Sequence, residues 1–314
     1  MENKTTPTAV LLMAYGSPET TADVAPYFTH IRGGVRPEEK LITEIEERYR
    51  RVGGKTPLYE ITKRQAAGLQ ELLDERAGHG KFKVYVGMKH WHPFIKDVLA
   101  EIKKEGIKKV IAIALAPHYS KMSIGGYENF LAEAGDGLNI ELVESWHTNP
   151  HLIAGIVAQI HAALAENMYG EKPPYLVFTA HSLPERIREW RDPYEAQLLE
   201  TSRLIASHFS DYEWDFSFQS AGHTKEPWLG PDILDTLADL KKKGKDRILV
   251  TSIGFVADNL EILFDLDIEA QETAKQLGIA LARTEMRNTH PLFMEALYDI
   301  TMHSQPSVGE NRIN

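Results

Sequence analysis

The chain of 314 residues contains no cysteine. That absence excludes a disulfide framework, a cysteine nucleophile, a cysteine-type zinc site and an iron–sulfur cluster held by cysteines. Basic residues are fewer than acidic ones, 35 Lys plus Arg against 45 Asp plus Glu, so the formal net charge is −10. Because nucleic acid is bound through a basic face, we expect no nucleic-acid partner. The remaining composition, 43% apolar and 25% charged, is typical of a globular protein.

Long hydrophobic runs are also missing. The longest unbroken apolar stretch, 110–117, is much too short to span a bilayer. The polar start, 1–7, leads directly into a predicted strand and lacks the pattern of a signal peptide. We therefore expect a cytoplasmic protein without a transmembrane segment.

Short β-rich runs alternate with longer amphipathic stretches along the chain. Strands are predicted at 9–14, 82–87, 110–115, 140–144, 175–180, 214–218, 248–252 and 279–282. Several of these runs are almost continuously apolar, as in strands that are buried on both faces. Helices are predicted between them, for example at 93–105, 231–243 and 260–277, because apolar residues recur there at helical spacing and a glycine follows. The alternation predicts an α/β fold with parallel sheets flanked by helices.

The two halves of this pattern are similar. Residues 81–117 and 213–254 have the same order of strand, loop, proline, helix, lysine-rich turn and strand. A matching order indicates an internal duplication, although any two βαβ units share some of this punctuation. We predict one α/β domain from 1–145 plus 286–310 and a second from 146–285, with 304–314 as a loose tail. Ligands in such folds lie beyond the carboxyl ends of the strands.

A histidine stands at one of these strand ends. His181 follows the apolar run 175–180 and precedes Ser182-Leu183-Pro184-Glu185. Imidazole suits proton transfer or metal binding near neutral pH. Because the chain has 13 histidines, a hydrogen-bonded core histidine is an equally good interpretation of this one from position alone. Ser182 lacks the G-x-S-x-G context of a nucleophile elbow.

Carboxylates are concentrated after the predicted strand 248–252. Between Asp258 and Glu272 there are six acidic residues and no basic one. Glu261, Asp265 and Glu269 are spaced four residues apart, which on an α-helix forms one row with about 6 Å of rise per step. Such a row suits a divalent cation, since these ions prefer oxygen ligands. The spacing is equally compatible with a solvated acidic face near a helix N-terminus.

Aromatic and basic residues gather in the first half. Tyr15 follows the strand 9–14, where it can close the strand end, cap a flat ligand or ligate a metal. Basic and aromatic side chains recur at 30–34, 48–51 and 89–92, a mixture that can hold carboxylates and pack on a flat ring. Arg50 and Arg51 are better explained as part of a solvated helix face. No G-x-G-x-x-G or Walker pattern is present, so a dinucleotide or ATP site is poorly supported.

At these residues the sequence resembles the ferrochelatases, specifically the Gram-positive type that inserts iron into coproporphyrin III. The resemblance covers residues 11–297, nearly the whole chain. It rests on matches at 13–18, 30–32, 53–58, 89–90, 115–120, 145–146, 180–184, 192–194, 227–231 and 254–258. The most specific are His181-Ser182-Leu183-Pro184 and Gly254-Phe255-Val256-Ala257-Asp258, followed by Glu261.

The resemblance implies two similar Rossmann-like, chelatase-type domains with a porphyrin cleft between them. It places His181 and Glu261 as catalytic residues at the metal, with Asp265 and Glu269 as a second position for a divalent cation such as Mg²⁺. Tyr15 would face the metal from the opposite side. The positions matching those that hold the ring or its propionates are Tyr15, Arg32, Arg48, Tyr49, Thr56, Lys89 and Tyr127.

The implied reaction is the insertion of Fe²⁺, a substrate, into a porphyrin during haem biosynthesis. It requires no cofactor, although a haem-pathway protein is expected to accept the product, and the enzyme is expected to be a monomer. Asn259 stands where the family often has histidine, which removes one possible proton relay. Two alternatives stay open: a cobalt or nickel chelatase of another tetrapyrrole, and a porphyrin or haem carrier without catalytic activity.

Overall fold

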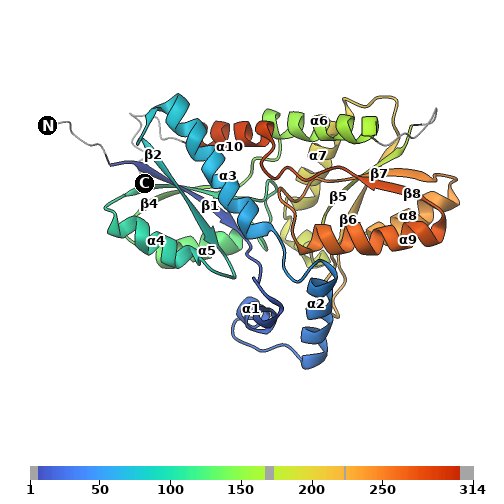
Figure 1. The fold of residues 1–314 in the computed structure, drawn as a ribbon, viewed down its shortest axis with the longest axis horizontal. Coiled ribbons are helices and arrows are strands. Elements are labelled where there is room, and N and C mark those ends of the chain that lie inside the picture. The colour runs from blue at the N-terminus through green and yellow to red at the C-terminus, as the bar shows by residue number, and fades with distance from the viewer. Residues whose placement is uncertain (1–5, 167–172, 223, 305–314) are drawn as a thin grey trace.

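The computed structural model describes residues 6–166, 173–222 and 224–304, which fold around two four-stranded parallel sheets (Figure 1). The first sheet has the order β2-β1-β3-β4 and consists of β1 (Thr8–Ala14), β2 (Phe82–Met88), β3 (Lys109–Ala114) and β4 (Asn139–Val143). The second has the order β6-β5-β7-β8 and consists of β5 (Tyr175–His181), β6 (Trp214–Gln219), β7 (Arg247–Ser252) and β8 (Ala280–Arg283). The equivalent order in both sheets confirms the predicted pair of similar α/β units.

Each strand predicted from an apolar run is present, and its bounds differ from the prediction by no more than one residue at either end. The reason is burial on both faces. Along β1, the five residues from Ala9 to Met13 are 0% exposed, and in β5 Val177 and Phe178 are equally inaccessible. Continuous apolar runs of this length are stable only between two layers of helices.

The helices cover both faces of the sheets. In the first part of the chain they are α1 (Val24–Ile31), α2 (Glu39–Arg51), α3 (Leu58–Leu73), α4 (Ile95–Lys104) and α5 (Ile124–Ala134). In the second part they are α6 (Pro150–Glu166), α7 (Tyr194–Ala206), α8 (Ile233–Lys242), α9 (Gln271–Leu277) and α10 (Pro291–His303). Two short 3₁₀-helices are η1 (Thr21–Asp23) and η3 (Glu185–Trp190), and two π-helical segments are η2 (Asp74–Gly78) and η4 (Ile262–Ala270).

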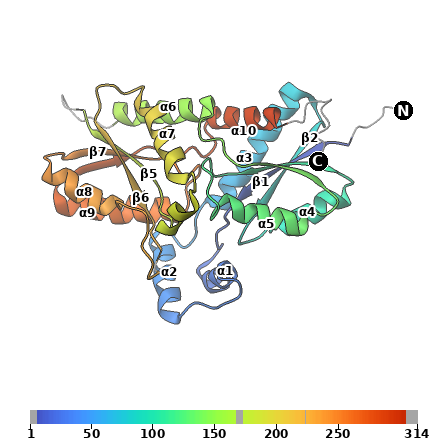
Figure 2. The ribbon, with the colours of Figure 1, turned by 180° about the vertical axis from the view of Figure 1, so that it is seen from behind.

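The largest hydrophobic core joins the two halves. It includes Val10 of the first sheet, Phe178 of the second, and residues of α6 and α10, which lie end to end along one side of both sheets (Figures 1 and 2). Because α6 and α10 share this core, the predicted domain boundaries at 145 and 286 stay a prediction. Of the predicted tail, 304–314, all but Ser304 lies outside the described residues. No helix in the described ranges is both long and apolar enough to cross a membrane.

The segment after β7 corrects one expectation. The predicted α-helix over 260–277 is π-helical from Ile262 to Ala270, and only Gln271–Leu277 is a regular α-helix. A π-helix has i→i+5 hydrogen bonds, so side chains four residues apart no longer stack in one straight row. Sequence spacing cannot distinguish the two windings, because apolar residues recur at nearly the same intervals in both.

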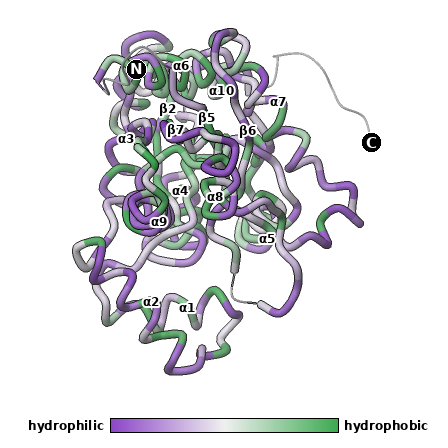
Figure 3. Tube along the Cα trace, turned by 90° about the vertical axis from the view of Figure 1, so that its right-hand side faces the viewer, coloured by the Kyte–Doolittle hydropathy of each residue, from purple (hydrophilic) through white to green (hydrophobic). Residues whose placement is uncertain are grey.

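Helices α1 and α2 stand apart from the two sheets (Figures 1 and 2). Together with η1 they form a lobe, residues 21–51. Helix α2 is mostly hydrophilic (Figure 3), and it buries only Ile42, Ile45 and Tyr49. The lobe therefore has a small core of its own and depends on polar contacts with the rest of the molecule.

Candidate active site

The candidate residues come from equivalent strand ends in the two halves. Tyr15 directly follows β1, and His181 is the last residue of β5. Each of these strands is second in the order of its sheet, between β2 and β3 or between β6 and β7. Carboxyl ends at such positions are where ligands bind in open parallel sheets.

His181 lies in a largely apolar environment. Its ring centroid is 6.2 Å from that of Phe255 and 6.5 Å from that of Trp228. Burial lowers the pKa of His181, although the Ser182 carbonyl and the charge of Asp265 oppose that shift. His181 is therefore neutral at physiological pH.

The Nδ1 atom of His181 contacts the main-chain carbonyl oxygen of Ser182. A carbonyl oxygen can only accept a hydrogen bond, so Nδ1 must carry the hydrogen. In the neutral ring, Nε2 then has a free lone pair, which is the state required of a proton acceptor or a metal ligand.

A close backbone approach explains the glycine at 254. A Cβ atom at this position would lie 2.6 Å from Ala180 Cβ and 3.0 Å from Ala180 Cα. Glycine therefore lets the loop after β7 pass directly against the end of β5, beside His181. This approach brings η4 and its carboxylates to the histidine.

Four of the six acidic residues between 258 and 272 pair with arginines from other parts of the chain. Asp258 and Asp267 both contact Arg283, Asp265 contacts Arg48, and Glu272 contacts Arg51. Glu261 and Glu269 are the two that form no ion pair within residues 6–166, 173–222 and 224–304. The acidic segment is thus divided into four carboxylates with structural partners and two without.

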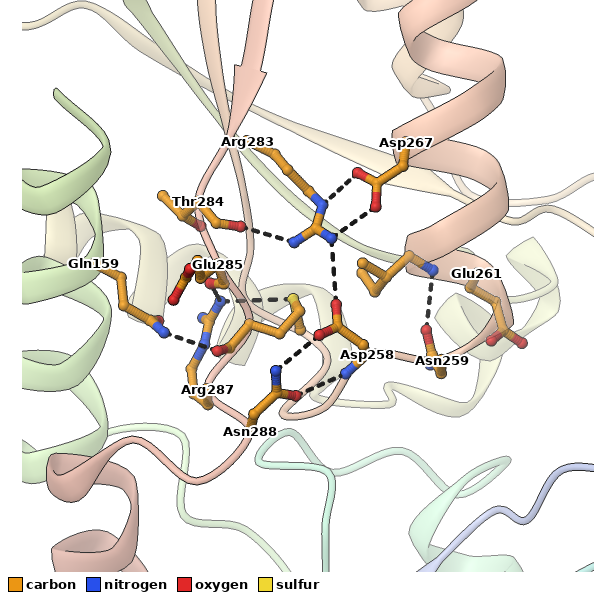
Figure 4. Close-up of polar contacts among 12 residues, drawn as sticks. Gln159, Asp258, Asn259, Glu261, Asp267, Arg283, Thr284, Glu285, Arg287 and Asn288 are labelled. Carbon is orange, nitrogen blue, oxygen red and sulfur yellow. Dashed lines mark hydrogen bonds and ion pairs between the residues drawn. The ribbon is translucent and has the colours of Figure 1, made fainter. Parts of the chain in front are cut away.

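The start of the segment is held by a polar cluster (Figure 4). The Asp258 carboxylate accepts hydrogen bonds from Asn288 Nδ2 at 2.7 Å and from Arg283 Nη2 at 3.3 Å. Asn288 Oδ1 in turn accepts from the Asp258 main-chain N–H at 3.0 Å. Asn259 Oδ1 accepts a hydrogen bond from the Ile262 N–H at 3.0 Å, at the start of the helical segment. In Figure 4 the Glu261 carboxylate points away from this cluster.

The carboxyl groups of Glu261 and Asp265 are difficult to ionise. Burial raises the pKa of Asp265 to about 7, despite the Ser220 hydroxyl that donates a hydrogen bond to it, and the charge of Glu261 adds to the rise. Burial also raises the pKa of Glu261, while Arg48 opposes that shift. Glu269 is half-buried and its charge reaches Asp265. Carboxylates with pKa values raised toward neutrality can accept and release protons.

Tyr15 belongs to the first half of the molecule, whereas His181 and Glu261 belong to the second. Its side chain is 45% exposed, and its ring centroid lies 4.6 Å from that of His90. Partial desolvation by the surrounding side chains raises the pKa of Tyr15 to about 12, and the charge of Glu261 contributes to the rise. Because Glu261 influences Tyr15 in this way, residues from both halves share one electrostatic environment.

A buried ammonium group adjoins Tyr15. Lys89 Nζ lies 5.9 Å from the centre of the Tyr15 ring and 5.0 Å from that of the buried Tyr127 ring. Its hydrogen bond to the Ser123 carbonyl oxygen is long, at 3.4 Å, and burial lowers the pKa of Lys89 to about 8. Burial likewise raises the pKa of Tyr127. The group is therefore a cation with weak protein partners.

Three hydroxyl groups meet next to Tyr15. Ser17 Oγ lies 2.8 Å from Thr56 Oγ1 and 3.2 Å from the Tyr49 hydroxyl. Arg48 precedes Tyr49 on α2 but turns toward the acidic segment, with Nη1 at 3.7 Å from Asp265 Oδ1. Arg32 is exposed at the end of α1, and no side-chain hydrogen bond or ion pair holds it within the described residues.

Several residues here were not predicted from the sequence. Ser220 follows β6 with a φ of +63° and contacts Asp265, and Ser17 links Thr56 to Tyr49. Both stand just after a strand, so the rule that ligands gather at strand ends would have found them. His30 lies with Nδ1 at 3.2 Å from His90 Nδ1; it belongs to the run 30–34 that the sequence singled out, although a helix from outside the sheet brings it there.

Two hollows of about 750 and 380 Å³ open on the surface of the first half. His30 and Phe130 line both, and Lys89 lines the smaller one. Among the described residues, no three histidine, aspartate or glutamate side chains come close enough to hold a metal ion by themselves. A metal at His181 and Glu261 would therefore need ligands from another molecule.

Comparison with known proteins gives a consistent result. The family model described as Ferrochelatase matches residues 7–305. The chain is 45% identical over 295 residues to a ferrochelatase of Herpetosiphon aurantiacus, covering 92% of this chain and 96% of that protein. It is 39% identical to the coproporphyrin III ferrochelatases of Oceanobacillus iheyensis, over 95% of this chain and 97% of that one, and of Bacillus subtilis, over 93% and 96%.

Solved structures support the fold. SirB from Bacillus subtilis with Fe³⁺ superimposes with a TM-score of 0.60 at 10% identity, covering 95% of both chains. CbiX, the terminal enzyme of sirohaem biosynthesis in denitrifying bacteria, gives 0.58 at 14% identity, covering 95% of this chain and all of that one. At these identities the likeness concerns the two-domain fold alone. The family match, by contrast, spans the strand ends that carry Tyr15, His181 and Glu261, and by that match this chain belongs to the ferrochelatase family.

Proposed function

We propose that this protein inserts Fe²⁺ into coproporphyrin III to give Fe-coproporphyrin in haem biosynthesis. Its relatives from Oceanobacillus iheyensis and Bacillus subtilis are named for coproporphyrin III. The observation that carries the proposal is the neutral His181 with a free Nε2, which the charge of Asp265 reaches, while the charge of the neighbouring Glu261 reaches Tyr15 in the first half.

The reaction requires the removal of two protons. A free porphyrin has two pyrrole N–H groups, and both protons must leave as Fe²⁺ forms bonds to the four nitrogens. His181 accepts a proton at Nε2, and Glu261, whose pKa is raised by burial, assists as the second acceptor. No electron is transferred, so the step needs neither a redox cofactor nor a nucleotide.

The metal passes through as a substrate. His181 and Glu261 offer too few ligands to retain an ion, which suits transfer to the porphyrin nitrogens. Asp265 and Glu269 lie behind Glu261 in the sequence and supply oxygen ligands, the type that Fe²⁺ or an accessory Mg²⁺ accepts. Arg48 already offsets the charge of Asp265, so a cation there would compete with the guanidinium.

The first half holds the ring. Lys89 offers a buried positive charge to a propionate, and Thr56 and Tyr49 offer hydroxyl groups. Arg32, exposed and without a side-chain partner among the described residues, is free to pair with another propionate. The Tyr127 ring, 5.0 Å from Lys89 Nζ, is the last of the predicted porphyrin-binding residues in this half. A substrate with four propionates uses more of these groups than one with two.

The test is an anaerobic assay in which the apo-protein receives Fe²⁺ and either coproporphyrin III or protoporphyrin, followed by absorbance. We expect many turnovers with coproporphyrin III and a lower kcat/KM with protoporphyrin. Equal rates would defeat the substrate assignment while leaving iron insertion in place. A single equivalent of shifted spectrum would identify a carrier, and turnover with Co²⁺ or Ni²⁺ but not Fe²⁺ would identify another chelatase.

The proposal also covers the setting of the enzyme. We expect a monomer acting in the cytoplasm and delivering its product to an acceptor protein of the haem pathway. Size-exclusion chromatography with light scattering tests the first point, and a dimer mass near 71 kDa, twice the chain's 35.5 kDa, would contradict it.

A further inference from the structure

The lobe of residues 21–51 meets the second half along the segment that carries the acidic residues. Leu260 packs against the small core formed by Val24, Ile45 and Tyr49. This apolar contact reaches the residue next to Glu261. The lobe is therefore in a position to influence where η4 lies.

Two arginines of α2 hold the same aromatic ring of η4. Arg48 Cζ lies 4.8 Å from the centre of the Phe264 ring, and Arg51 Cζ lies 5.3 Å from it. Residues three apart on a helix lie on one face, so the two guanidinium groups approach the ring from the same helix face. Phe264 is buried, at 6% exposure, and such a ring attracts both cations.

Each arginine also pairs with a carboxylate of the acidic segment 258–272. Arg48 Nη1 lies 3.7 Å from Asp265 Oδ1, and Arg51 Nη2 lies 2.5 Å from Glu272 Oε1. The neighbouring Arg50 makes ion pairs of 2.8 and 2.9 Å, but with Glu46 and Glu47 of its own helix. Arg51 thus joins two halves of the molecule, whereas Arg50 joins only turns of α2.

We propose that Arg51 is a positioning residue, which clamps Phe264 together with Arg48 and so fixes Glu261 relative to Tyr15 across the cleft. Phe264 is one π-helical turn or less from both Glu261 and Asp265, so a shift of the helix backbone at Phe264 would move both carboxylates. The Arg51–Glu272 pair is partly exposed, at 37% and 56% of its side-chain surfaces, and such pairs contribute little to overall stability. Its effect is on geometry. The inference rests on the proposed iron insertion.

The test compares Arg51→Gln with the matched control Arg50→Gln. We expect Arg51→Gln to lower kcat roughly three- to tenfold with the KM for coproporphyrin III unchanged, because small displacements of reacting groups slow the chemical step. Arg51→Lys, which keeps the charge and the contact with the ring, should recover most of that loss. Arg50→Gln should leave kcat unchanged. Melting temperatures of all three should stay close to that of the unmodified protein.

A second measurement needs no turnover. Amide hydrogen exchange over residues 260–272 of the apo-protein should be faster in Arg51→Gln than in Arg50→Gln. If the two variants match in exchange and in kcat, the clamp has no positioning role and the inference is overturned. If Arg51→Gln changes only the porphyrin KM, Arg51 binds substrate and the inference is also overturned. An unmodified protein that inserts no iron would refute the proposed function instead, and the exchange comparison would still decide the clamp.

Discussion

The ammonium group of Lys89 lies 5.0 Å from the centre of the Tyr127 ring, in a site that is 7% exposed at the lysine. Burial lowers the pKa of Lys89 to about 8 from an ordinary 10.5, so the ring and the Ser123 carbonyl do not fully replace water. A charge that is held at the expense of stability is available to a substrate anion.

Replacing Lys89 with Met should therefore stabilise the protein and weaken its binding of porphyrin. Below pH 8 the lysine is charged in both states, and the folded state carries the desolvation penalty in full. As pH rises from about 8 to 10.5, the unfolded state binds more protons than the folded one, so the penalty disappears. We expect Lys89→Met to gain on the order of 2 kcal/mol at pH 7 and nothing above pH 10.5.

Denaturant unfolding at both pH values and fluorescence titration with coproporphyrin III check these two effects. A variant that is less stable at pH 7 would show that Lys89 has a structural role and would contradict the reading of a charge reserved for substrate.

His181→Ala should abolish most iron insertion while porphyrin still binds. The substitution removes the Nε2 lone pair, and a general base contributes roughly 100- to 10,000-fold to rate. The contacts of the first half remain, so the dissociation constant for coproporphyrin III should change by less than about threefold. Near-normal turnover by this variant would remove His181 from the mechanism.

Glu261→Gln and Glu269→Gln should affect different kinetic parameters. Glu261 faces the shared environment of Tyr15 and His181, so its replacement should lower kcat strongly. Glu269 lies farther along η4 and should mainly raise the Fe²⁺ concentration needed for half-maximal rate. Neither carboxylate has an ion-pair partner in the described parts of the chain, so both variants should melt at the same temperature or higher. Iron titrations at saturating porphyrin distinguish the two roles. If both variants keep the iron dependence of the unmodified protein and are less stable, Glu261 and Glu269 have a structural role instead.

Thr56→Val should weaken both stability and substrate binding, whereas Thr56→Ser should not. The Thr56 hydroxyl lies 2.8 Å from Ser17 Oγ and is largely buried, so losing it removes one of the two hydroxyl partners of the half-buried Ser17, at about 1 kcal/mol. Serine keeps the hydroxyl. Thermal melts and the KM for coproporphyrin III check the pair, and equal behaviour of the two variants would mean that the hydroxyl is not used.

His118 provides a test of acid stability away from the candidate site. It is 2% exposed, its Nε2 lies 2.9 Å from Thr201 Oγ1, and burial lowers its pKa to about 3. Between pH 6.5 and 3 the unfolded state binds the proton that the folded state does not, so stability falls as pH falls, by up to about 1.4 kcal/mol per unit for this residue. His118→Gln should flatten that decline. Unfolding curves from pH 7 to 4 give the slope, and an unchanged slope would assign acid sensitivity to other groups.

The sequence by itself determined the strands and their order of connection. Runs such as Ala9–Met13 have no alternative to burial on both faces, and strand, helix and strand in succession lead to parallel pairing. For the same reason the strand ends were identifiable, and with them Tyr15 and His181. The motif around Gly254 was recognisable too, through its resemblance to the ferrochelatases, and the structure shows that a Cβ atom at that position would collide with Ala180.

Only the tertiary structure decided how the acidic segment is wound and which of its carboxylates are available. Spacing of four residues predicted one straight row, but the segment is π-helical from Ile262 to Ala270, and distant groups hold its side chains. Arg283 holds Asp267, Ser220 holds Asp265, and Arg48 and Arg51 hold Phe264. These partners lie 16 to 216 residues away from the groups they hold. Periodicity reports on neighbours along a helix, whereas charge pairing across the fold leaves no trace in local spacing. For that reason the distinction between the paired Asp265 and the unpaired Glu261 appears only when the chain is folded.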